Sequence, residues 1–374
     1  MSVVFGDTNS PLPAIVPLPG EIIADELDAR GWTQADLADI MGRPLQAINE
    51  IIRGAKQITP STAMQLSQAF GNSAEQWIRL EMLYRLWLAR SQTNSDIAIR
   101  SSLYSIAPIR EMVKRGWVPD NCDLQQTIAS LCAFYNVTSL DNISLIKARY
   151  RQSRETRAGL QIQHTWLQRT CNLASKQNIQ PFTRQTFKVA CDQLEHLMTD
   201  PMDINQIPTV LAKTGIRFVI VPNLPGAYID GAVTYLNGLK SHPIVALTLR
   251  FDRIDNFWFT LWHELAHIAL GHSGTIIDEL DSTGENKQEK DADLLAAKFN
   301  IPEEPYTRFR KSSNGRYTRK AVETFATEIH RHPGIVVGQL HRDGMAYSNM
   351  RNYLLKVRDH LKPFIDTEFA ETHK

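Results

Sequence analysis

The sequence predicts a multidomain protein that is mainly α-helical and carries one small β-sheet in its C-terminal half. Three observations predict this fold class. Apolar residues recur at helical spacing from Gly20 to about Asp200, short β-branched runs follow Asp203, and helical spacing then resumes. The 374 residues suffice for two or three domains, each with its own apolar core. We therefore expect an all-α N-terminal bundle, a helical linker region and a C-terminal α+β domain.

The composition is that of an ordinary water-soluble protein. Apolar residues make up 43% of the chain and the formal net charge is +1, so any nucleic-acid-binding surface must be local. The four cysteines form no CxxC pair, which favours buried thiols in a reducing compartment over disulfides or a thiolate metal site. The N-terminus has no signal-peptide pattern, and no apolar run is long enough to span a membrane. We expect a cytoplasmic protein without a membrane partner.

Changes in residue pattern along the chain predict five segments. Residues 1–19, rich in proline and glycine, form an extended N-terminal arm, and residues 20–90 form a small helical domain. Residues 91–200 form a helical middle region. Residues 201–355 form the α+β domain, and residues 356–374 form a C-terminal tail. The candidate functional residues lie in the second and fourth segments.

Two consecutive short helices within residues 20–90 have the spacing of a helix-turn-helix. Thr33 is placed as the N-cap of the first helix, and Gly42 supplies the turn after it. Pro44 lies at the first turn of the next helix, where its missing N–H costs nothing. In that helix, predicted over 45–53, isoleucines pack inward and polar residues face outward. A generic helical bundle would show the same pattern, so spacing alone does not decide between the two.

The polar residues of this region are candidate DNA contacts. Glutamine and asparagine can hydrogen-bond adenine edges, whereas arginine binds guanine or a phosphate. Arg53 and Lys56 lie where backbone phosphates are expected. The complete candidate set is Thr33, Gln34, Arg43, Gln46, Ala47, Asn49, Glu50, Arg53 and Lys56.

Residues 19 to about 85 resemble the HigA-type antitoxins of the XRE helix-turn-helix class. The features that carry the resemblance are PGEI at 19–22, GWTQ at 31–34, INEIIRG at 48–54 and FG at 70–71, followed by Trp77. The resemblance implies a homodimer that binds a palindromic double-stranded operator, often in its own promoter. It also points to a toxin-antitoxin system, in which the protein partner or substrate is either a cognate toxin or a helix-turn-helix repressor.

After Asp203 the pattern changes to short strands. The runs 216–222, 231–236 and 243–249 are β-branched and separated by Gly, Pro and Asn, which predicts three strands of a small sheet. Helices are then expected over 257–270, 289–299, 320–331 and 335–342. Strands directly before the helix at 257–270 give the layout of a zincin-like domain.

The helix predicted over 257–270 contains the pattern HExxH at residues 263–267. Histidines at i and i+4 lie on one helix face about one turn apart, so His263 and His267 can bind a single Zn²⁺. Glu264 lies between them in position to act as a general base. The alternative is a pair of surface histidines around a glutamate. The pattern predicts a zinc-dependent hydrolase.

A hydrolytic zinc centre needs a third protein ligand in addition to the two histidines. The helix predicted over 289–299 offers several acidic residues. Asp291 is favoured because its neighbours have the spacing of packing residues and would direct it toward the first helix. Glu289 is the alternative third ligand, and Asp293 also competes. His272 lies at i+5 from His267 and is expected to cap the helix or face solvent.

The same region resembles the ImmA/IrrE metallopeptidases, also called the DUF955 family. The features that carry the resemblance are FWFTL at 257–261, the acid-Ala-Asp and Ile-Pro pattern after the HExxH helix, HPGIVVGQL at 332–340 and the block at 103–117. The resemblance covers about residues 100–355. The third ligand of the family is usually the glutamate just before the alanine, and this chain has Asp291 there. The resemblance implies narrow specificity, typically for a helix-turn-helix repressor.

These patterns predict a DNA-binding transcriptional regulator that carries a zinc-dependent metalloendopeptidase domain with narrow specificity. Such a protein would control its own operon and cleave one regulatory protein, whose chain would add as a strand to an edge such as Gly231–Leu236. The alternative is an antitoxin-like repressor whose zincin fold does not cut and serves binding, dimerisation or metal sensing. A Glu264→Gln variant that cleaves as well as the wild type would exclude the first hypothesis.

Overall fold

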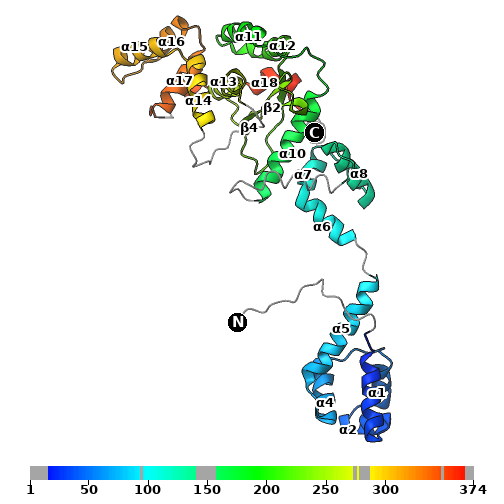
Figure 1. Cartoon of the computed structure of the whole chain (residues 1–374). Coiled ribbons are helices and arrows are strands. Elements are labelled where there is room, and N and C mark those ends of the chain that lie inside the picture. Colours follow the sequence, from blue (N-terminus) through cyan, green and yellow to red (C-terminus); the bar gives the residue numbers. More distant parts are fainter. Residues whose placement is uncertain are drawn as a thin grey trace. The chain divides into compact units, whose positions relative to one another are not determined.

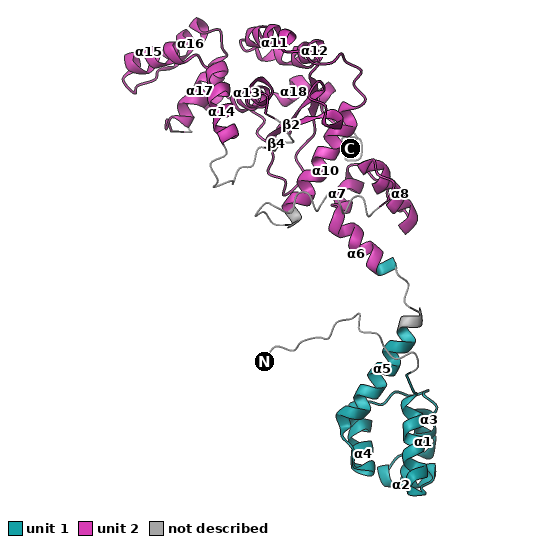
Figure 2. Cartoon of the chain, viewed as in Figure 1, with its two compact units in different colours: residues 1–97 teal, residues 98–374 magenta. Residues whose placement is uncertain are grey.

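A computed structural model describes residues 16–92, 96–139, 157–272, 276–277, 287–346 and 349–366 of the chain (Figure 1). The chain divides into two compact units, residues 1–97 and residues 98–374 (Figure 2). The first unit contains the domain predicted over 20–90, whereas the helices of the predicted middle region belong almost entirely to the second unit. Residues 1–15, most of the predicted N-terminal arm, lie outside the described residues.

The described part of the first unit is a bundle of short helices. They are α1 (Pro19–Arg30), α2 (Gln34–Met41), α3 (Leu45–Ile52), α4 (Pro60–Phe70) and α5 (Ala74–Gln92). Their apolar faces meet in one core, in which Leu37, Ala63 and Trp77 are almost fully buried. The first four helices have 12 residues or fewer and would not be stable alone, so this shared core stabilises them.

Local capping interactions fix where these helices begin and end. The Thr33 hydroxyl accepts a hydrogen bond from the backbone N–H of Asp36, and the Asp36 carboxylate accepts one from the backbone N–H of Thr33. Gly31 and Gly42 end α1 and α2 in the left-handed conformation that glycine adopts at little cost. The predicted N-cap and the predicted turn are therefore confirmed. Pro44 is the N-cap of α3 and lies one residue earlier than predicted.

The second unit is built around a mixed sheet with the strand order β1-β3-β2-β4. β1 (Arg217–Ile220) pairs in parallel with β3 (Pro243–Leu247). β2 (Gly231–Tyr235) pairs antiparallel with β3 and with β4 (Ile276–Ile277). The three predicted strands are confirmed with slightly shorter bounds. β4 was not predicted, because two residues are too few to show a period of two.

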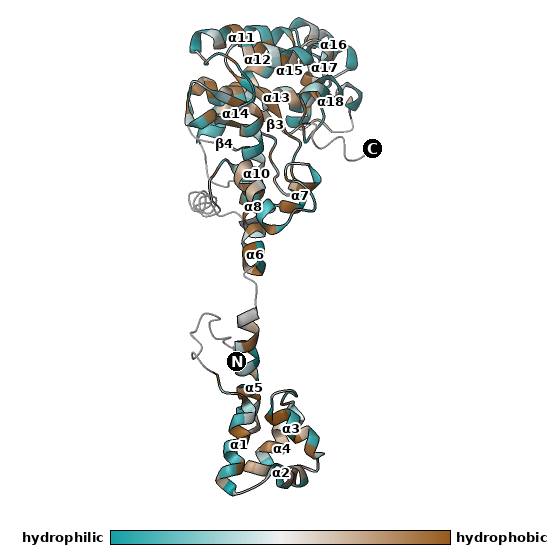
Figure 3. Cartoon of the chain, turned by 90° about the vertical axis from the view of Figure 1, so that its right-hand side faces the viewer, coloured by the Kyte–Doolittle hydropathy of each residue, from teal (hydrophilic) through white to brown (hydrophobic). Residues whose placement is uncertain are grey.

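The sheet has an apolar core on each face. Side chains alternate between the faces, so Phe218 and Ile220 pack in one core and Val219 and Val221 in the other. The first core contains residues of helices α11 to α18, and the second contains residues of α6, α7, α8 and α10. Figure 3 shows both hydrophobic and hydrophilic residues along these helices, as expected for helices that bury one face. The sheet is therefore the middle layer of the unit.

Twelve helices of the second unit fall within the described residues, and their order is shown in Figure 1. They are α6 (Asp96–Ile106), α7 (Ile109–Lys114), α8 (Leu124–Tyr135), α10 (Arg157–Ala174), α11 (Arg184–His196), α12 (Ile207–Lys213), α13 (Ile254–Leu270), α14 (Lys287–Asn300), α15 (Glu303–Ser313), α16 (Arg319–Glu328), α17 (Pro333–Arg342) and α18 (Arg358–Leu361). Short 3-10 helices cover Pro201–Gln206, Leu236–Gly238, Arg351–Tyr353 and Lys362–Phe364.

The segment predicted as a C-terminal tail folds back onto the second unit as far as Asp366. Ile365 forms a parallel bridge with Ile220 of β1. The Asp366 carboxylate accepts two hydrogen bonds from the Arg169 guanidinium, at 2.8 and 2.9 Å, and both side chains are buried. The ion pair ties α10 to a residue 197 positions further along the chain. Residues 367–374 lie outside the described part.

Two predictions about the whole chain can be compared with the structure. All four cysteines are free thiols, as expected from their spacing. Cys191 is buried, and burial is the main reason that its pKa rises to about 12. Among the described helices, none combines the length and the apolar character needed to cross a lipid bilayer.

Candidate functional site

α13 carries the HExxH pattern and packs against β2, β3, α14 and α17. The helix begins after Arg253 and ends at Gly271, which adopts the left-handed conformation. Because protein surrounds almost all of α13, apolar residues such as Trp258 and Leu261 occupy most of its circumference. The two histidines are therefore carried by a helix that is otherwise buried among apolar side chains.

His263, His267 and Glu289 bring three ligand atoms together. The Nε2 atoms of the two histidines lie 3.0 Å apart. The Oε2 atom of Glu289, on α14, lies 3.1 Å from Nε2 of His263 and 3.5 Å from Nε2 of His267. All three ligand atoms lie within 4.8 Å of one another. Two imidazoles and one carboxylate form a donor set typical of hydrolytic zinc sites.

The other ring nitrogen of each histidine is also engaged. Nδ1 of His263 lies 2.9 Å from a carboxylate oxygen of Asp293, and Nδ1 of His267 lies 2.8 Å from Nδ1 of His272. We assign a proton on Nδ1 of His263 to the first of these bonds, which leaves its Nε2 lone pair for a metal. Partners of this kind fix the orientation of metal-binding imidazoles. The residues present therefore fit a divalent metal ion.

Electrostatic interactions in this cluster keep Glu289 ionised. Burial by itself would raise the pKa of the Glu289 carboxyl. When the imidazoles also carry protons on Nε2, they donate hydrogen bonds to Glu289, and these bonds together with the imidazole charge outweigh burial and lower this pKa to about 2. Because a carboxylate must be deprotonated to bind a metal, Glu289 is ready to bind one at neutral pH.

Glu289, the alternative third ligand, joins the two histidines, whereas Asp291, the favoured one, is not part of the cluster. Helix geometry explains the difference. Glu289 and Asp293 are one turn apart on α14 and share a face, whereas Asp291 lies two residues from each of them. Asp291 is half-buried, and its negative charge favours the protonated form of His272. The i, i+4 spacing of the two other acids was the signal in the sequence that could have identified this face.

The roles of Asp293 and His272 beside the histidines were not predicted. Asp293 was considered only as a competing ligand, and its carboxylate instead contacts His263 from the side opposite the cluster. His272 was expected to cap the helix or face solvent, but it is half-buried against His267. The turn that ends α13 at Gly271 brings His272 back toward the helix.

Glu264, the predicted general base, is buried beside the start of β2, with 1% of its surface exposed. A Cβ atom on Gly231 would lie 2.4 Å from Oε1 of Glu264, so a larger residue would displace the carboxylate or the strand. β2 therefore limits where this carboxylate can lie.

A cavity of about 480 Å³ adjoins His263. Side chains of α13, α14 and α17 line it, together with Asp230, which precedes β2. Small-ligand sites in proteins have volumes of roughly 300–1,000 Å³. The cavity is therefore large enough to hold a side chain of a peptide that binds at the histidine cluster.

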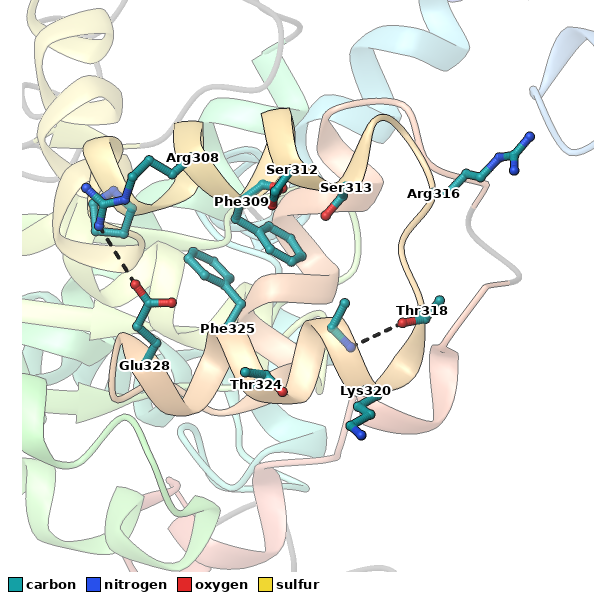
Figure 4. Close-up of a pocket in the computed structure, with 12 residues that line it drawn as sticks. Arg308, Phe309, Ser312, Ser313, Arg316, Thr318, Lys320, Thr324, Phe325 and Glu328 are labelled. Carbon is teal, nitrogen blue, oxygen red and sulfur yellow. Dashed lines mark hydrogen bonds and ion pairs between the residues drawn. The ribbon is translucent and has the colours of Figure 1, made fainter.

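A second cavity, of about 630 Å³, lies between α15 and α16 (Figure 4). Phe309 and Phe325 stack in it, with ring centroids 4.3 Å apart and planes 6° apart. Arg308 pairs with Glu328 at 3.8 Å, and Figure 4 shows Arg316 pointing away from the cavity. The residues that line this cavity include none of the histidine cluster, so we assign it no function.

The predicted DNA contacts lie at the start of α2, in the turn between α2 and α3, on α3 and in the turn after α3. Gln34, Gln46, Arg53 and Lys56 are exposed. The Gln46 side-chain amide donates a hydrogen bond to the Glu50 carboxylate at 3.0 Å, one turn further along α3. A short α3 that follows the turn at Gly42 and has a polar face beside its buried isoleucines is what a recognition helix requires.

Other predicted DNA contacts are engaged within the bundle. Thr33 caps α2, and Nε of Arg43 donates to the Gln65 side chain on α4 at 2.6 Å. Asn49 is half-buried, and its Oδ1 atom is buried without a hydrogen-bond partner among the described residues. Ala47 is half-buried. These residues are therefore less available to DNA than Gln46 and Arg53.

We expected β2 to have a free edge to which a substrate strand could add. In the structure, β4 pairs with part of that edge. Ala232 and Val233 pair with Ile277 and Ile276 of β4. The prediction of an open edge along Gly231–Leu236 is wrong at these two positions, because β4 could not be identified in the sequence.

Comparison with known families identifies both units. Residues 23–77 match the helix-turn-helix family, and residues 228–330 match the IrrE N-terminal-like domain of the M78 peptidases. The fold and these matches define a helix-turn-helix DNA-binding regulator with a metallopeptidase-family domain. Through its N-terminal unit, the chain belongs to the helix-turn-helix family.

Several known proteins are similar to the N-terminal unit. Virulence-associated protein I of Dichelobacter nodosus is 34% identical over 96 residues, which cover 25% of this chain and 85% of that protein. A solved antidote protein of a plasmid maintenance system from Nostoc punctiforme is 38% identical over 20% of this chain and 84% of its own, with a TM-score of 0.20. A solved HigA-family addiction-module antidote protein from Coxiella burnetii is 31% identical over 23% of this chain and 92% of its own, with a TM-score of 0.21.

Proposed function

We propose that this regulator contains a zinc-dependent peptidase centre in which His263, His267 and Glu289 bind the metal. The observation that carries the proposal is the convergence of their three ligand atoms within 4.8 Å, from two helices that pack on each other. A bound zinc ion would supply Lewis acidity that polarises a peptide carbonyl and a water molecule. His272 and Asp293 hold the two imidazoles in orientation.

Glu264 is the general base of the proposed reaction. Its buried carboxylate takes a proton from the attacking water as the water oxygen bonds to the carbonyl carbon. It then delivers that proton to the amide nitrogen as the C–N bond breaks, so the free amine leaves neutral. The contact with Gly231 keeps the carboxylate in one place during both transfers.

We propose that α3 reads operator DNA from the major groove. Gln46 is exposed on its polar face, with the half-buried Glu50 beside it, and Arg53 and Lys56 follow it as exposed cations suited to phosphates. Helix-turn-helix proteins commonly bind as dimers, one copy to each half-site, so we propose a homodimer on a palindromic operator of its own operon.

We further propose that the peptidase centre cuts one specific protein and does not degrade proteins in general. A chain that is directed to one operator meets mainly the proteins of that operon, such as a cognate toxin or a helix-turn-helix repressor. The cleaved protein is therefore a regulatory partner encoded close to the operator.

The test is zinc-dependent cleavage by the full-length protein. The protein, with Zn²⁺ or with a chelator, is incubated with the proteins encoded beside its own gene and with itself. We expect cleavage at a single bond, which is lost in Glu264→Gln although zinc remains bound. Asp359→Asn, which changes an exposed carboxylate paired with Lys362, is the matched control and leaves cleavage unchanged.

Cleavage by Glu264→Gln at the wild-type rate would exclude the proposed reaction. Absence of cleavage, with operator binding intact, would support the alternative of a repressor that uses this domain for binding, dimerisation or metal sensing.

A further inference from the structure

Arg342, in the last turn of α17, lines the cavity beside His263. Its guanidinium carbon lies 3.7 Å from the ring centroid of Phe259, which is a close cation–π contact. The Phe259 ring in turn lies 6.4 Å from the ring of His263, between centroids. These three side chains form a row from the histidine cluster to a cationic group.

The Arg342 guanidinium forms no ion pair among the described residues, although three carboxylates lie around it. Partial desolvation by the surrounding protein lowers the pKa of Arg342, although the residue as a whole is exposed. The negative charges of Asp255, Asp293 and Asp343 oppose this effect and raise the pKa of Arg342. Each of these carboxylates has a nearer partner: Arg253 for Asp255, His263 for Asp293, and both Tyr306 and Arg310 for Asp343. The guanidinium therefore keeps donors for a ligand.

We propose that Arg342 binds a carboxylate of the peptide that enters this cavity, an inference that rests on the proposed peptidase function. The planar guanidinium presents paired N–H donors that match a carboxylate, and its stacking on Phe259 holds the plane in position. Leu294 and Ala297 also line the cavity and suit the methylene groups that precede a side-chain carboxylate. The carboxylate comes either from an acidic side chain near the cleaved bond or from the C-terminus of the peptide.

Two acidic residues also line the cavity, and they raise the alternative of a cationic ligand. Asp293 contacts Nδ1 of His263 at 2.9 Å, and Asp230 faces Arg250 at 3.5 Å. Both acids therefore already face a cation or a proton donor. Arg342 is the charged group of this cavity that lacks such a partner, so the cavity selects a negative ligand.

Binding of defined peptide pools to the full-length Glu264→Gln protein tests the proposal without any cleavage. The pools contain short random peptides with one fixed central residue. The first pool has glutamate there and blocked ends, the second has glutamine and blocked ends, and the third has glutamine and a free C-terminal carboxylate. A fourth pool, with lysine and blocked ends, tests the cationic alternative. We expect the first or the third pool to bind about tenfold more tightly than the second.

Substitution of Arg342 must remove this preference. In Arg342→Gln the difference between the pools disappears, and in Arg342→Lys it shrinks, because lysine keeps the charge but not the paired donors. Arg308→Gln, which removes an exposed arginine of the second cavity, leaves the preference intact. Thermal unfolding of each variant checks that the second unit is folded. If Arg342→Gln is unfolded, the binding preference of Arg342→Lys tests the proposal instead.

Equal binding of all pools to the protein with Arg342, or tightest binding of the lysine pool, would overturn the proposal. So would a preference that survives Arg342→Gln. A preference for the first pool identifies an acidic side chain as the source, and a preference for the third identifies the C-terminus. Because binding is measured on a variant that does not cut, a failure of the proposed peptidase activity would leave these results unchanged and be recognised separately.

Discussion

The two units of this chain are stabilised in different ways. In the first unit, the ion pairs Arg30–Glu26 and Arg85–Glu81 join residues four positions apart on one helix, and the helix ends are set by local caps. In the second unit, the buried pair Arg169–Asp366 spans 197 positions, and the histidine cluster joins two helices.

This difference shows why the two units differ in what they can do. A bundle with local caps and an apolar core presents its polar residues outward, where they can contact DNA. A unit with buried charges must give each of them a partner, since an unpaired buried charge is costly, and in this unit the partner of Arg169 comes from a distant part of the chain. Such a unit can therefore build an enclosed reactive centre, which the first unit lacks among its described residues.

The largest expected effect concerns the third metal ligand. Loss of an outer partner of a metal-binding histidine typically lowers metal affinity by about 10–100-fold, so loss of a direct ligand is expected to cost about 100-fold or more. We expect Glu289→Gln to lower zinc affinity by this amount, as measured by competition with a chromophoric chelator. Asp291→Asn is the matched control and changes zinc affinity by less than about threefold. The opposite result would make Asp291 the ligand.

The second prediction tests whether the units act independently. Gln46→Ala is expected to weaken binding to the DNA upstream of its own gene by about tenfold, because one base contact is lost. Zinc affinity of this variant should equal that of the wild type, and Glu289→Gln should bind DNA as the wild type does. Fluorescence anisotropy with labelled duplexes measures DNA binding by both variants, and competition with a chromophoric chelator measures their zinc affinity. Weaker DNA binding by Glu289→Gln would mean that the metal centre and α3 are coupled.

The third prediction concerns the cap of α2. Thr33→Ala removes the hydroxyl that accepts a hydrogen bond from Asp36, so the first unit should lose about 1 kcal/mol of stability. Thr33→Ser keeps the hydroxyl and serves as the control. Thermal denaturation, followed by helical circular dichroism, should show a lower midpoint for the first unit alone. A shift in the transition of the second unit would contradict the local nature of this cap.

The smallest effect is a pH dependence in the second unit. His332 caps α17 by accepting a hydrogen bond from the backbone N–H of Gly334, and burial lowers its pKa from the ordinary 6.5 although the charge of Asp200 opposes this. Below pH 6.5 the unfolded chain binds a proton more readily than the folded chain, so the contribution of His332 to stability declines as pH falls through the lowered pKa.

His332→Asn retains a capping acceptor and removes the titration. Between about pH 7.5 and pH 5.5, the melting temperature of this variant should therefore fall less than that of the wild type, because the variant has no side chain here that is protonated more readily in the unfolded chain. Differential scanning calorimetry at several pH values measures the difference. Identical pH profiles for the two proteins would show that His332 makes no such contribution.

The helix ends of the first unit around the turn at Gly42 could be predicted from the sequence, because their signals are local. Thr33, Gly31 and Gly42 fix helix ends through residues at most four positions away. The sequence did not predict which polar side chains form hydrogen bonds within the bundle. Arg43 contacts Gln65, which is 22 residues away, and no local pattern indicates that contact.

The proposed metal centre could be predicted only in part. The two histidines are four residues apart on one helix, so HExxH indicates their common face directly. Glu289 is 26 residues from His263, and its position depends on how α14 packs against α13. Arg342 comes from a third helix and reaches the cavity only through the fold of the whole unit. Residues brought together by tertiary packing leave no periodic signal.

The buried pair of Arg169 with Asp366 has a consequence for synthesis on the ribosome. The first unit is complete once residue 97 has emerged, so it can fold and bind DNA early. The second unit still lacks the partner of Arg169 until residue 366 has emerged. Translation that stops between these two points would release a DNA-binding fragment whose peptidase-type unit is not yet closed. The order of synthesis thus places the proposed operator binding before the proposed proteolysis.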